Sequence, residues 1–282
     1  MNAHLSRSVN LRSDASVAAR LDRLISRALE TDGQPPFNEA SLLEKTEVLF
    51  FERDGELVGA AMTGDEVEFV VDPAERRRGY GEQILRAVLT PTFAAWAHGD
   101  HPAARVLAER YGLRRDRTLL QLRLGLDGLD QRESLDQRGP AGGLTIDTFR
   151  PGVDDAAWVA LNARAFAGHP EQGAITLATL QPRLAENPAE HFLLARDTDG
   201  GILGYCWLKI ADDLGEIYVL GVDPDRAGSG IGRALLAAGL AHLKALGIGE
   251  SNLYVEADNE PAMRLYRAFG YTDHMVDVLY RR

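Results

Sequence analysis

The sequence predicts an α+β fold made of two tandem units, each a mixed sheet with helices packed on it. The chain has 282 residues, which exceeds the ~100–200 residues of a typical domain. Similar segments follow one another in the same order in both halves, and each half mixes helical and strand patterns. The repeat period of roughly 150 residues is too long for a solenoid unit, so it indicates a duplicated domain.

Each half begins with an amphipathic helix. Apolar residues recur at helical spacing from Val17 to Ala28, and a Thr-Asp-Gly sequence then ends the pattern. In the second half we expect residues 156–166 to form the corresponding helix. Two strands follow in each half, and we expect them to flank hairpin turns at Asp54-Gly55 and at residues 199–201.

The later part of each unit is clearest in the second half. A β-rich run over 216–222 enters a glycine-rich turn and then a helix that Gly247 ends. A further strand, 253–256, leads to a helix over 261–269, which Gly270 ends. Residues 126–143 have no sustained apolar period and finish in a Gly-Pro-Ala-Gly-Gly cluster, so we interpret them as a linker between units 1–125 and 144–282.

The glycine-rich turn occurs twice, each time after a strand and before a helix. In the first half Asp72-Pro73 breaks the strand, and an Arg-x-x-Gly-x-Gly sequence starts at Arg76. In the second half Asp223-Pro224 precedes three glycines at alternate positions, beginning with Gly228. Such a turn presents backbone N–H groups and the positive end of a helix to an anion. The competing explanation, glycines needed only for turning, accounts less well for the duplication. A P-loop is excluded because no Gly-Lys-Ser/Thr follows, and a dinucleotide fold is disfavoured because no βαβ repeat surrounds the glycines.

These motifs resemble the GNAT acyl-CoA N-acyltransferases, whose pyrophosphate turn is Arg or Gln followed by x-x-Gly-x-Gly or Ala. The resemblance implies two GNAT domains, each a mixed, mostly antiparallel sheet flanked by helices, and acetyl-CoA as the acyl donor with no metal. The first half fits the motif in full. In the second half Ala227 stands where Arg or Gln is expected, and Arg226 comes one residue early. The candidate cofactor-binding residues are Val71, Arg76, Arg77, Arg78, Gly79 and Gly81 in the first half, and Leu220, Val222, Arg226, Gly228, Ser229, Gly230, Gly232 and Asn259 in the second.

Acyl transfer from a thioester to an amine needs a neutral amine, a stabilised oxyanion and a proton for the departing thiolate. The period-two rule places the side chains at 216, 218, 220 and 222 on one face of their strand. Gly221, inside that strand, indicates a bulge or a close backbone approach. We expect Glu216, which opens the strand, to accept the amine proton. The GNAT resemblance implies that this strand is bulged and splays from its neighbour around the acetyl-pantetheine arm, and it thereby implies that the N–H of Leu220 binds the oxyanion. A solvated strand-end glutamate is the competing explanation for Glu216.

The resemblance also implies an acid, because GNAT proteins commonly carry a tyrosine at the position of Tyr266. A phenol of pKa ~10 stays protonated at neutral pH and can donate to a thiolate whose conjugate acid has a pKa of ~8.5. A packing tyrosine is the alternative. In the first half Asp65 aligns with Glu216, but Ala108 aligns with Tyr266. We therefore expect a catalytically degenerate N-terminal unit that can still hold acetyl-CoA, and a catalytic C-terminal unit.

A wider resemblance, over nearly the whole chain, is to the tandem GNAT mycothiol synthase family. The segments WAHGDHPAAR, NARAFAGHPEQG, GYCWLK, GEIYVLGVDP and LYVEADNEPA carry it. It implies acetylation of the cysteinyl amine of desacetylmycothiol, a hydroxyl-rich pseudodisaccharide. Such an acceptor calls for many hydrogen-bond partners and an aromatic face. The candidate acceptor-binding residues are His169, Glu171, Gln172, Trp207, Lys209 and Glu216. The alternatives are a GNAT acting on another amine, such as an aminoglycoside or a protein N-terminus, and a non-catalytic acetyl-CoA sensor.

Composition limits the remaining possibilities. Lys plus Arg number 31 against 42 Asp plus Glu, for a net charge of −11, and a general binder of nucleic acid or anionic membrane needs the opposite sign. Cys206, the single cysteine, allows neither an internal disulfide nor a cysteine zinc cluster. No apolar run reaches the ~18 residues that cross a bilayer, and residues 1–12 lack a signal-peptide core. We expect a cytoplasmic monomer whose partner is a small-molecule acceptor, not nucleic acid or a membrane.

Overall fold

The computed structural model describes residues 4–5, 9–10, 15–38, 41–42, 47–127, 143–168 and 172–282. Its contacts divide the chain into two compact units. Unit 1 contains Met1–Leu120, Glu256–Asp258 and Met275–Arg282, and unit 2 contains Gln121–Val255 and Asn259–His274. Most of the predicted linker, residues 128–142, lies outside the described residues, and the boundaries 1–125 and 144–282 stay a prediction. Nothing in the sequence indicates that two short segments from the second half, Glu256–Asp258 and Met275–Arg282, belong to unit 1.

Unit 1 contains a small sheet of order β1-β3-β4-β5, with β2 paired to β3. The β3–β4 hairpin turns at Asp54 and Gly55, whose φ angles are 52° and 85°, as in a two-residue type I′ turn. This confirms the predicted hairpin. The strands are β1 (His4–Leu5), β2 (Val9–Asn10), β3 (Glu47–Arg53), β4 (Glu56–Met62) and β5 (Glu68–Val71).

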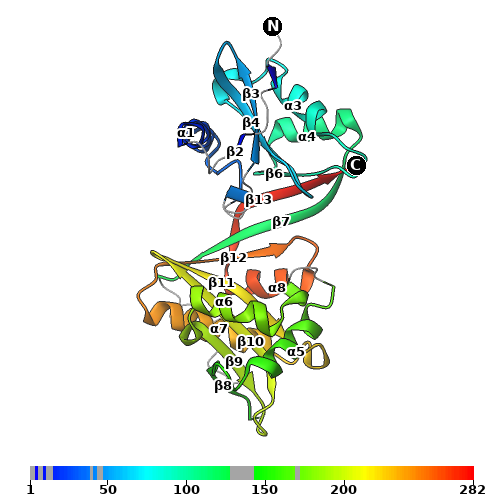
Figure 1. Cartoon of the computed structure of the whole chain (residues 1–282). Helices are drawn as coiled ribbons and strands as arrows, with labels where there is room; N and C mark the ends of the chain where they lie inside the picture. The colour runs from blue at the N-terminus through cyan, green and yellow to red at the C-terminus, as the bar shows by residue number, and fades with distance from the viewer. Residues whose placement is uncertain are drawn as a thin grey trace. The chain divides into compact units, whose positions relative to one another are not determined.

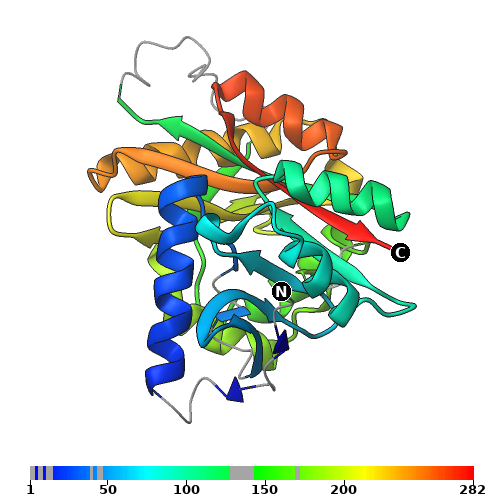
Figure 2. The same ribbon diagram turned by 90° about the horizontal axis from the view of Figure 1, so that it is seen from above.

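Helices cover both faces of this sheet. Helix α1 (Ala15–Asp32) buries Leu24 and Ala28 against Phe50 of β3, whereas α3 (Tyr80–Val88) buries Ile84 against Val58 of β4. Accordingly, α1 lies on the other side of β3 and β4 from α3 in Figures 1 and 2. The fold of unit 1 is completed by β6 (Ala94–His98), α4 (Pro102–Tyr111) and parts of β7 (Arg114–Gly125) and β13 (Thr272–Arg281). Strand β13 pairs antiparallel with β6 through residues 277–281.

Unit 2 contains the strand order β12-β11-β10-β9-β8. Strands β11 and β12 are parallel, and the other pairs are antiparallel. This confirms the mixed, mostly antiparallel sheet. The strands are β8 (Thr145–Thr148), β9 (Phe192–Arg196), β10 (Ile202–Ala211), β11 (Leu214–Val222) and β12 (Glu250–Glu256), and the helices are α5 (Asp155–Ala165), α6 (Leu177–Glu186), α7 (Ile231–Ala245) and α8 (Glu260–Phe269).

The sheet of unit 2 separates two packing layers. On one face Trp158 of α5 is fully buried and makes edge-to-face contacts with Phe192, Tyr205 and Trp207. On the other face α7 approaches so closely that a Cβ at Gly239 would lie 3.0 Å from Cys206 Sγ. Glycine at this helix position therefore allows the close packing of helix on sheet. Within the described residues, no helix is long and apolar enough to span a bilayer.

Candidate active site

The two glycine-rich turns have the same backbone conformation. In unit 1 Arg77 and Gly79 are left-handed, with φ of 61° and 84°, and in unit 2 Gly228 and Gly230 have φ of 77° and 86°. Each turn follows a 3-10 helix, Pro73–Glu75 or Pro224–Arg226, and leads into a helix. The conformation is thus duplicated even where one copy has arginine and the other glycine.

Both turns present an uncapped helix N-terminus. Gly79 and Gly230 are the N-cap residues of α3 and α7, and neither has a side-chain cap hydrogen bond. The first amides of a helix have no acceptor within the helix and lie at its positive end. A phosphate oxygen can accept those N–H groups, so the residues of both turns fit a pyrophosphate.

An ion pair supports each turn from the first helix of its unit. Arg27 of α1 donates to Asp72, with 2.5 Å between Nη2 and Oδ2, and Asp72 also accepts the amide N–H of Ala74 at 3.0 Å. In unit 2 Arg164 of α5 donates to Asp223. This ion pair was not predicted from the sequence, although each half has an arginine late in its first helix, which is the signal that indicates it.

The arginine of the first turn is held by a neighbouring carboxylate. The Arg76 guanidinium donates to both oxygens of Asp32, at 2.7 and 2.6 Å, and to the carbonyl of Val71 at 3.3 Å. In the second turn Arg226 is exposed, and its carbonyl accepts from Ser229 Oγ at 2.6 Å. Only unit 1 therefore has the motif arginine fixed beside the turn.

Strand β11 contains a bulge at Tyr218. Trp207 of β10 pairs with Val219 and Leu208 pairs with Ile217, which leaves Tyr218 as the extra residue. Gly221 itself is not the bulged residue. It is a point of close approach, because a Cβ there would lie 2.6 Å from the ring of Tyr205. The strand therefore contains a bulge at Tyr218 and a close approach at Gly221.

The bulge overturns the prediction that residues 216, 218, 220 and 222 share one face. Ile217 lies toward Gly239 of α7, so Glu216 before it is on the opposite, α5 face. Beyond the bulge the alternation is shifted by one residue. Leu220 pairs with Cys206, which faces α7, so Leu220 and Val222 are on the α7 face. The side chain of Glu216 and the side chains of Leu220 and Val222 therefore lie on opposite faces of the sheet, whereas the backbone N–H groups of the strand stay in its plane.

The strands of both units diverge beside the turns. In the described part of unit 2, β11 and β12 pair only over 214–216 with 250–252, although β11 continues to Val222. In unit 1, Val67, the residue before β5, forms a single parallel bridge with Ala95 of β6. Diverging strands leave main-chain groups at a sheet edge without their usual partners, where an extended ligand can bind.

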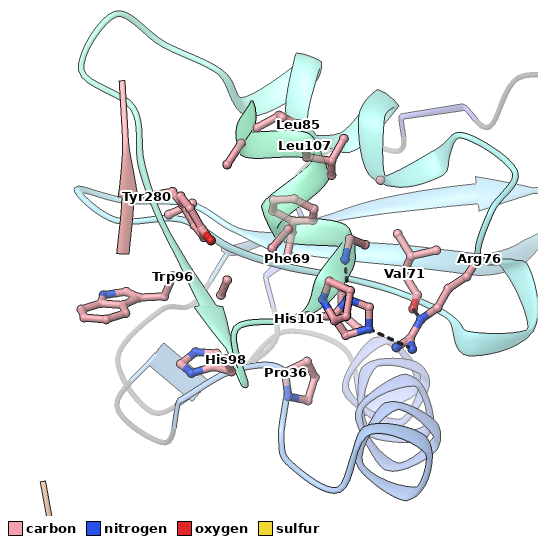
Figure 3. A pocket seen from close by; sticks show the side chains of 18 of the residues that line it. Pro36, Phe69, Val71, Arg76, Leu85, Trp96, His98, His101, Leu107 and Tyr280 are labelled. Atoms are coloured by element: carbon pink, nitrogen blue, oxygen red, sulfur yellow. Dashed lines mark hydrogen bonds between the residues drawn. The ribbon is translucent and has the colours of Figure 1, made fainter. Parts of the chain in front are cut away.

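In unit 1 a cavity of about 570 Å³ lies beside the diverging strands. Figure 3 shows Arg76 with His101 on one side of it, Tyr280 on the other, and Phe69 and Leu107 between them. Asp32, Gly79 and Gly81 also line the cavity. The turn and the diverging strands of unit 1 therefore border one continuous space.

Helix α8 of unit 2 carries Tyr266. Asn259 caps this helix by accepting the N–H of Ala262 at 3.2 Å, and His101 caps α4 in the same way through Nδ1. Tyr266 is 7% exposed and meets the ring of Tyr271 edge to face. Burial raises the pKa of the Tyr266 phenol, so it is protonated at neutral pH. In unit 1 Ala108 is buried at the matching helix position.

The candidate acceptor residues have different environments. His169 and Glu171 lie outside the described residues. Gln172 donates to Asn162 Oδ1 at 3.0 Å, and Lys209 is exposed. Trp207 is fully buried, stacks on Phe192 and donates its indole N–H to a backbone carbonyl. Its place is therefore in the core, where it supports the bulge by an edge-to-face contact with Tyr218.

Two further polar residues that contact the strands of unit 2 were not identified from the sequence. Arg183 of α6 donates to the hydroxyl of Tyr218 at 2.9 Å, and Asn162 of α5 accepts from Tyr205 at 2.5 Å. Both contacts join a helix to the strands only after folding. Among the described residues, no group of three or more His, Cys, Asp or Glu is placed to hold a metal ion.

Comparison with known proteins identifies the family. Residues 157–271 match the model of the Acetyltransferase (GNAT) family. A mycothiol acetyltransferase of Clavibacter michiganensis subsp. michiganensis is 49% identical over 95% of this chain and 96% of its own length. The chain belongs to the mycothiol acetyltransferase family. A second member, from Geodermatophilus obscurus, is 43% identical over 99% of this chain and 98% of its own.

Solved structures agree with this family at the level of the fold. A GCN5-related N-acetyltransferase from Sphaerobacter thermophilus matches 98% of this chain and 95% of its own, with a TM-score of 0.72 and 26% identity. A tandem GNAT protein from the clavulanic acid biosynthesis pathway matches 99% of this chain and 98% of its own length, with a TM-score of 0.70 and 15% identity. The predicted tandem GNAT architecture is confirmed, and the chain is an acetyltransferase of the class that uses acetyl-CoA as donor.

Proposed function

We propose that the chain transfers the acetyl group of acetyl-CoA to the cysteinyl amine of desacetylmycothiol, giving mycothiol. The observation that carries this proposal is the 49% identity over 95% of the chain to a mycothiol acetyltransferase. The acceptor binds beside α5 and α6, on the side of the sheet where Glu216 pairs across the strands with Lys209 and Gln172 hydrogen-bonds to Asn162 of α5. His169 and Glu171 remain candidates from the sequence, whereas the buried Trp207 is assigned a supporting part.

We propose that unit 2 performs the chemistry. Glu216 accepts a proton from the amine, directly or through water, so that the nitrogen lone pair can attack the thioester carbon. The Leu220 N–H donates to the carbonyl oxygen as negative charge develops there. The new C–N bond forms while the C–S bond breaks, the thiolate takes the phenolic proton of Tyr266, and the acylated nitrogen releases its remaining extra proton to solvent to give the neutral amide. Solvent then returns a proton to the tyrosine and removes the proton from Glu216.

The cofactor-binding assignments follow the turns. In unit 2 we propose that the amides of 228–232 bind the pyrophosphate, with Arg226 as the nearest cation, while Leu220 and Val222 pair with the pantetheine chain. In unit 1 the corresponding positions are Val71 and residues 76–81, all of which except Arg78 border the cavity. This second site binds an acyl-CoA without transferring the acyl group, because Ala108 cannot supply a proton. A cytoplasmic monomer stays a prediction of the sequence.

The acceptor assay tests this function. Full-length protein with acetyl-CoA and desacetylmycothiol should consume the thioester and give an N-acetylated product, identified by mass spectrometry. Consumption with aminoglycosides or peptides but not with desacetylmycothiol would support a different acceptor. Binding of acetyl-CoA with no product from any amine would support a sensor instead of an enzyme.

A further inference from the structure

Asn162 of α5 lies at the centre of a buried hydrogen-bond network in unit 2. It is fully buried, and both polar atoms of its side chain have partners. Nδ2 donates to the carbonyl of Gln172 at 2.6 Å, whereas Oδ1 accepts from Gln172 Nε2 at 3.0 Å and from the Tyr205 hydroxyl at 2.5 Å. Displacing any partner would leave a buried polar atom without a hydrogen bond, which costs free energy. The network therefore fixes the positions of Gln172 and Tyr205 relative to each other.

One arm of the network holds the end of the predicted acceptor segment, residues 169–173. The side chain of Gln172 is directed to Asn162, so it bonds to the protein itself. The next residue, Gly173, packs directly on the end of α5, because a Cβ there would lie 2.2 Å from the carbonyl oxygen of Phe166. Helix α5 thus holds this end of the segment at two successive residues.

The other arm reaches strand β11 through Tyr205. This side chain is fully buried, and Tyr205 stands directly opposite Gly221 in the β10–β11 pair. Its ring fills the space that a side chain at Gly221 would occupy, since a Cβ there would lie 2.6 Å from ring carbons and 2.8 Å from the hydroxyl oxygen. An aromatic ring that covers a cross-strand glycine packs against the backbone of that strand. The position of the Tyr205 ring therefore sets where the backbone of β11 lies.

Gly221 stands between the two residues whose N–H groups face the open edge of β11. The Asp223 N–H donates to the carbonyl of Leu203 on β10 at 2.8 Å. Alternate N–H groups of an antiparallel strand point to the same neighbour, so those of Leu220 and Val222 point away from β10. On that side β12 pairs with β11 only up to Glu216. The ring of Tyr205 thus supports the part of β11 to which the proposed mechanism assigns the thioester.

We infer that Asn162 and Tyr205 are positioning residues that set the acceptor segment against the thioester-binding edge of β11. This inference rests on the proposed function of unit 2. Both side chains are fully buried, so they act through Gln172 and Gly221 and not by contact with a substrate. Attack of an amine on a thioester requires the two reactants in near-attack geometry, and a misplacement of about 1 Å can cost about 10²-fold in rate. Gln172 is accordingly a tether of the segment.

Tyr205→Phe tests the arm to β11. The variant keeps the ring over Gly221 but loses the bond to Asn162, so its kcat should fall about tenfold while the KM for acetyl-CoA changes by less than about twofold. Tyr271→Phe is the matched control, because it also removes one buried hydroxyl hydrogen bond, to Ser251 at 2.7 Å. Both variants should show a similar small fall in melting temperature, but only Tyr205→Phe should lose rate.

Gln172→Ala tests the arm to the acceptor segment. Its kcat/KM for desacetylmycothiol should fall about fivefold, mainly through a higher KM, because one of two bonds that hold the segment is lost. Both variants act through Oδ1 of Asn162, so their effects should not multiply. The double variant should lose about 15-fold in kcat/KM, instead of the roughly 50-fold expected for independent sites.

The outcomes separate the inference from the function on which it rests. If the wild-type protein does not acetylate desacetylmycothiol, both fail. If it does, but Tyr205→Phe keeps the wild-type kcat or Tyr271→Phe loses as much, the function stands and the inference is overturned. Losses that multiply in the double variant also overturn it, because the two residues would then not act through Asn162. Should Tyr205→Phe fail to fold, an unchanged kcat/KM in Gln172→Ala overturns the inference and the fivefold loss supports it.

Discussion

Replacing Tyr266 by phenylalanine removes one oxygen atom from the proposed active site and leaves the ring. The edge-to-face contact with Tyr271 needs only the ring, so the fold should lose little stability. Burial raises the pKa of the phenol above its usual value of about 10, so the wild-type group is a proton donor throughout the range from about pH 6 to 9. If the phenol protonates the departing thiolate, the variant must use water instead.

The loss should be about 10²–10⁴-fold in kcat, the range for removal of a general acid. That corresponds to about 3–5 kcal/mol of transition-state stabilisation. The KM for acetyl-CoA should change little, because the phenol acts on the leaving group. Thioester consumption is followed by ultraviolet absorbance or mass spectrometry, since the acceptor carries its own thiol and reacts with thiol reagents.

Tyr271→Phe is the matched control. Its hydroxyl hydrogen-bonds with Ser251 Oγ at 2.7 Å in the core, so this variant should lose about 1 kcal/mol of stability and keep its kcat. A Tyr266→Phe enzyme with wild-type kcat at saturating substrates would refute the acid assignment. So would a loss in the control as large as in the variant, because the effect would then be one of packing.

Three other changes test separate parts of the molecule. Glu216→Gln should lower kcat/KM about 10²-fold or more at neutral pH, with part of the rate recovered at higher pH as more of the amine is neutral; a flat, wild-type pH profile would exclude Glu216 as the base. Ala227→Arg, which restores the motif arginine in unit 2, should lower the KM for acetyl-CoA about fivefold through a charge-assisted contact, and a raised KM would place the pyrophosphate elsewhere. His98→Gln should remove most of the dependence of unit 1 stability on pH between about 6.5 and 9, as measured by thermal unfolding.

The sign of the His98 effect follows from its surroundings. Burial by itself lowers the pKa of His98, but hydrogen bonds to Asp277 and Glu68 outweigh it and raise the pKa to about 9. The folded pKa thus exceeds the unfolded value of about 6.5. The stabilisation, at most about 3 kcal/mol, is fully present below pH ~6.5 and is lost as the pH rises through 9. A wild-type protein that grows more stable over this interval would contradict the assignment.

Local sequence determined much of the fold. The helix from Ala15 to Asp32 stops at Gly33, which is left-handed at φ 76°, and the Asp54-Gly55 hairpin forms where its turn residues predict it. The two glycine-rich turns could also be predicted from the sequence, because each depends only on its own glycines and on the helix that follows directly. Side-chain spacing and turn chemistry act over a few residues, so one segment contains the information.

Tertiary structure decided the features that depend on partners far away in sequence. The bulge at Tyr218 arises from the register of β11 against β10, and it moves Leu220 to the face opposite Glu216. The return of residues 275–282 to unit 1, which brings Tyr280 to the cavity and Asp277 to His98, needs strand pairing across more than half the chain. Sequence periodicity records which face of a segment is apolar, but the register and the choice of partner are set by the packing of the whole unit.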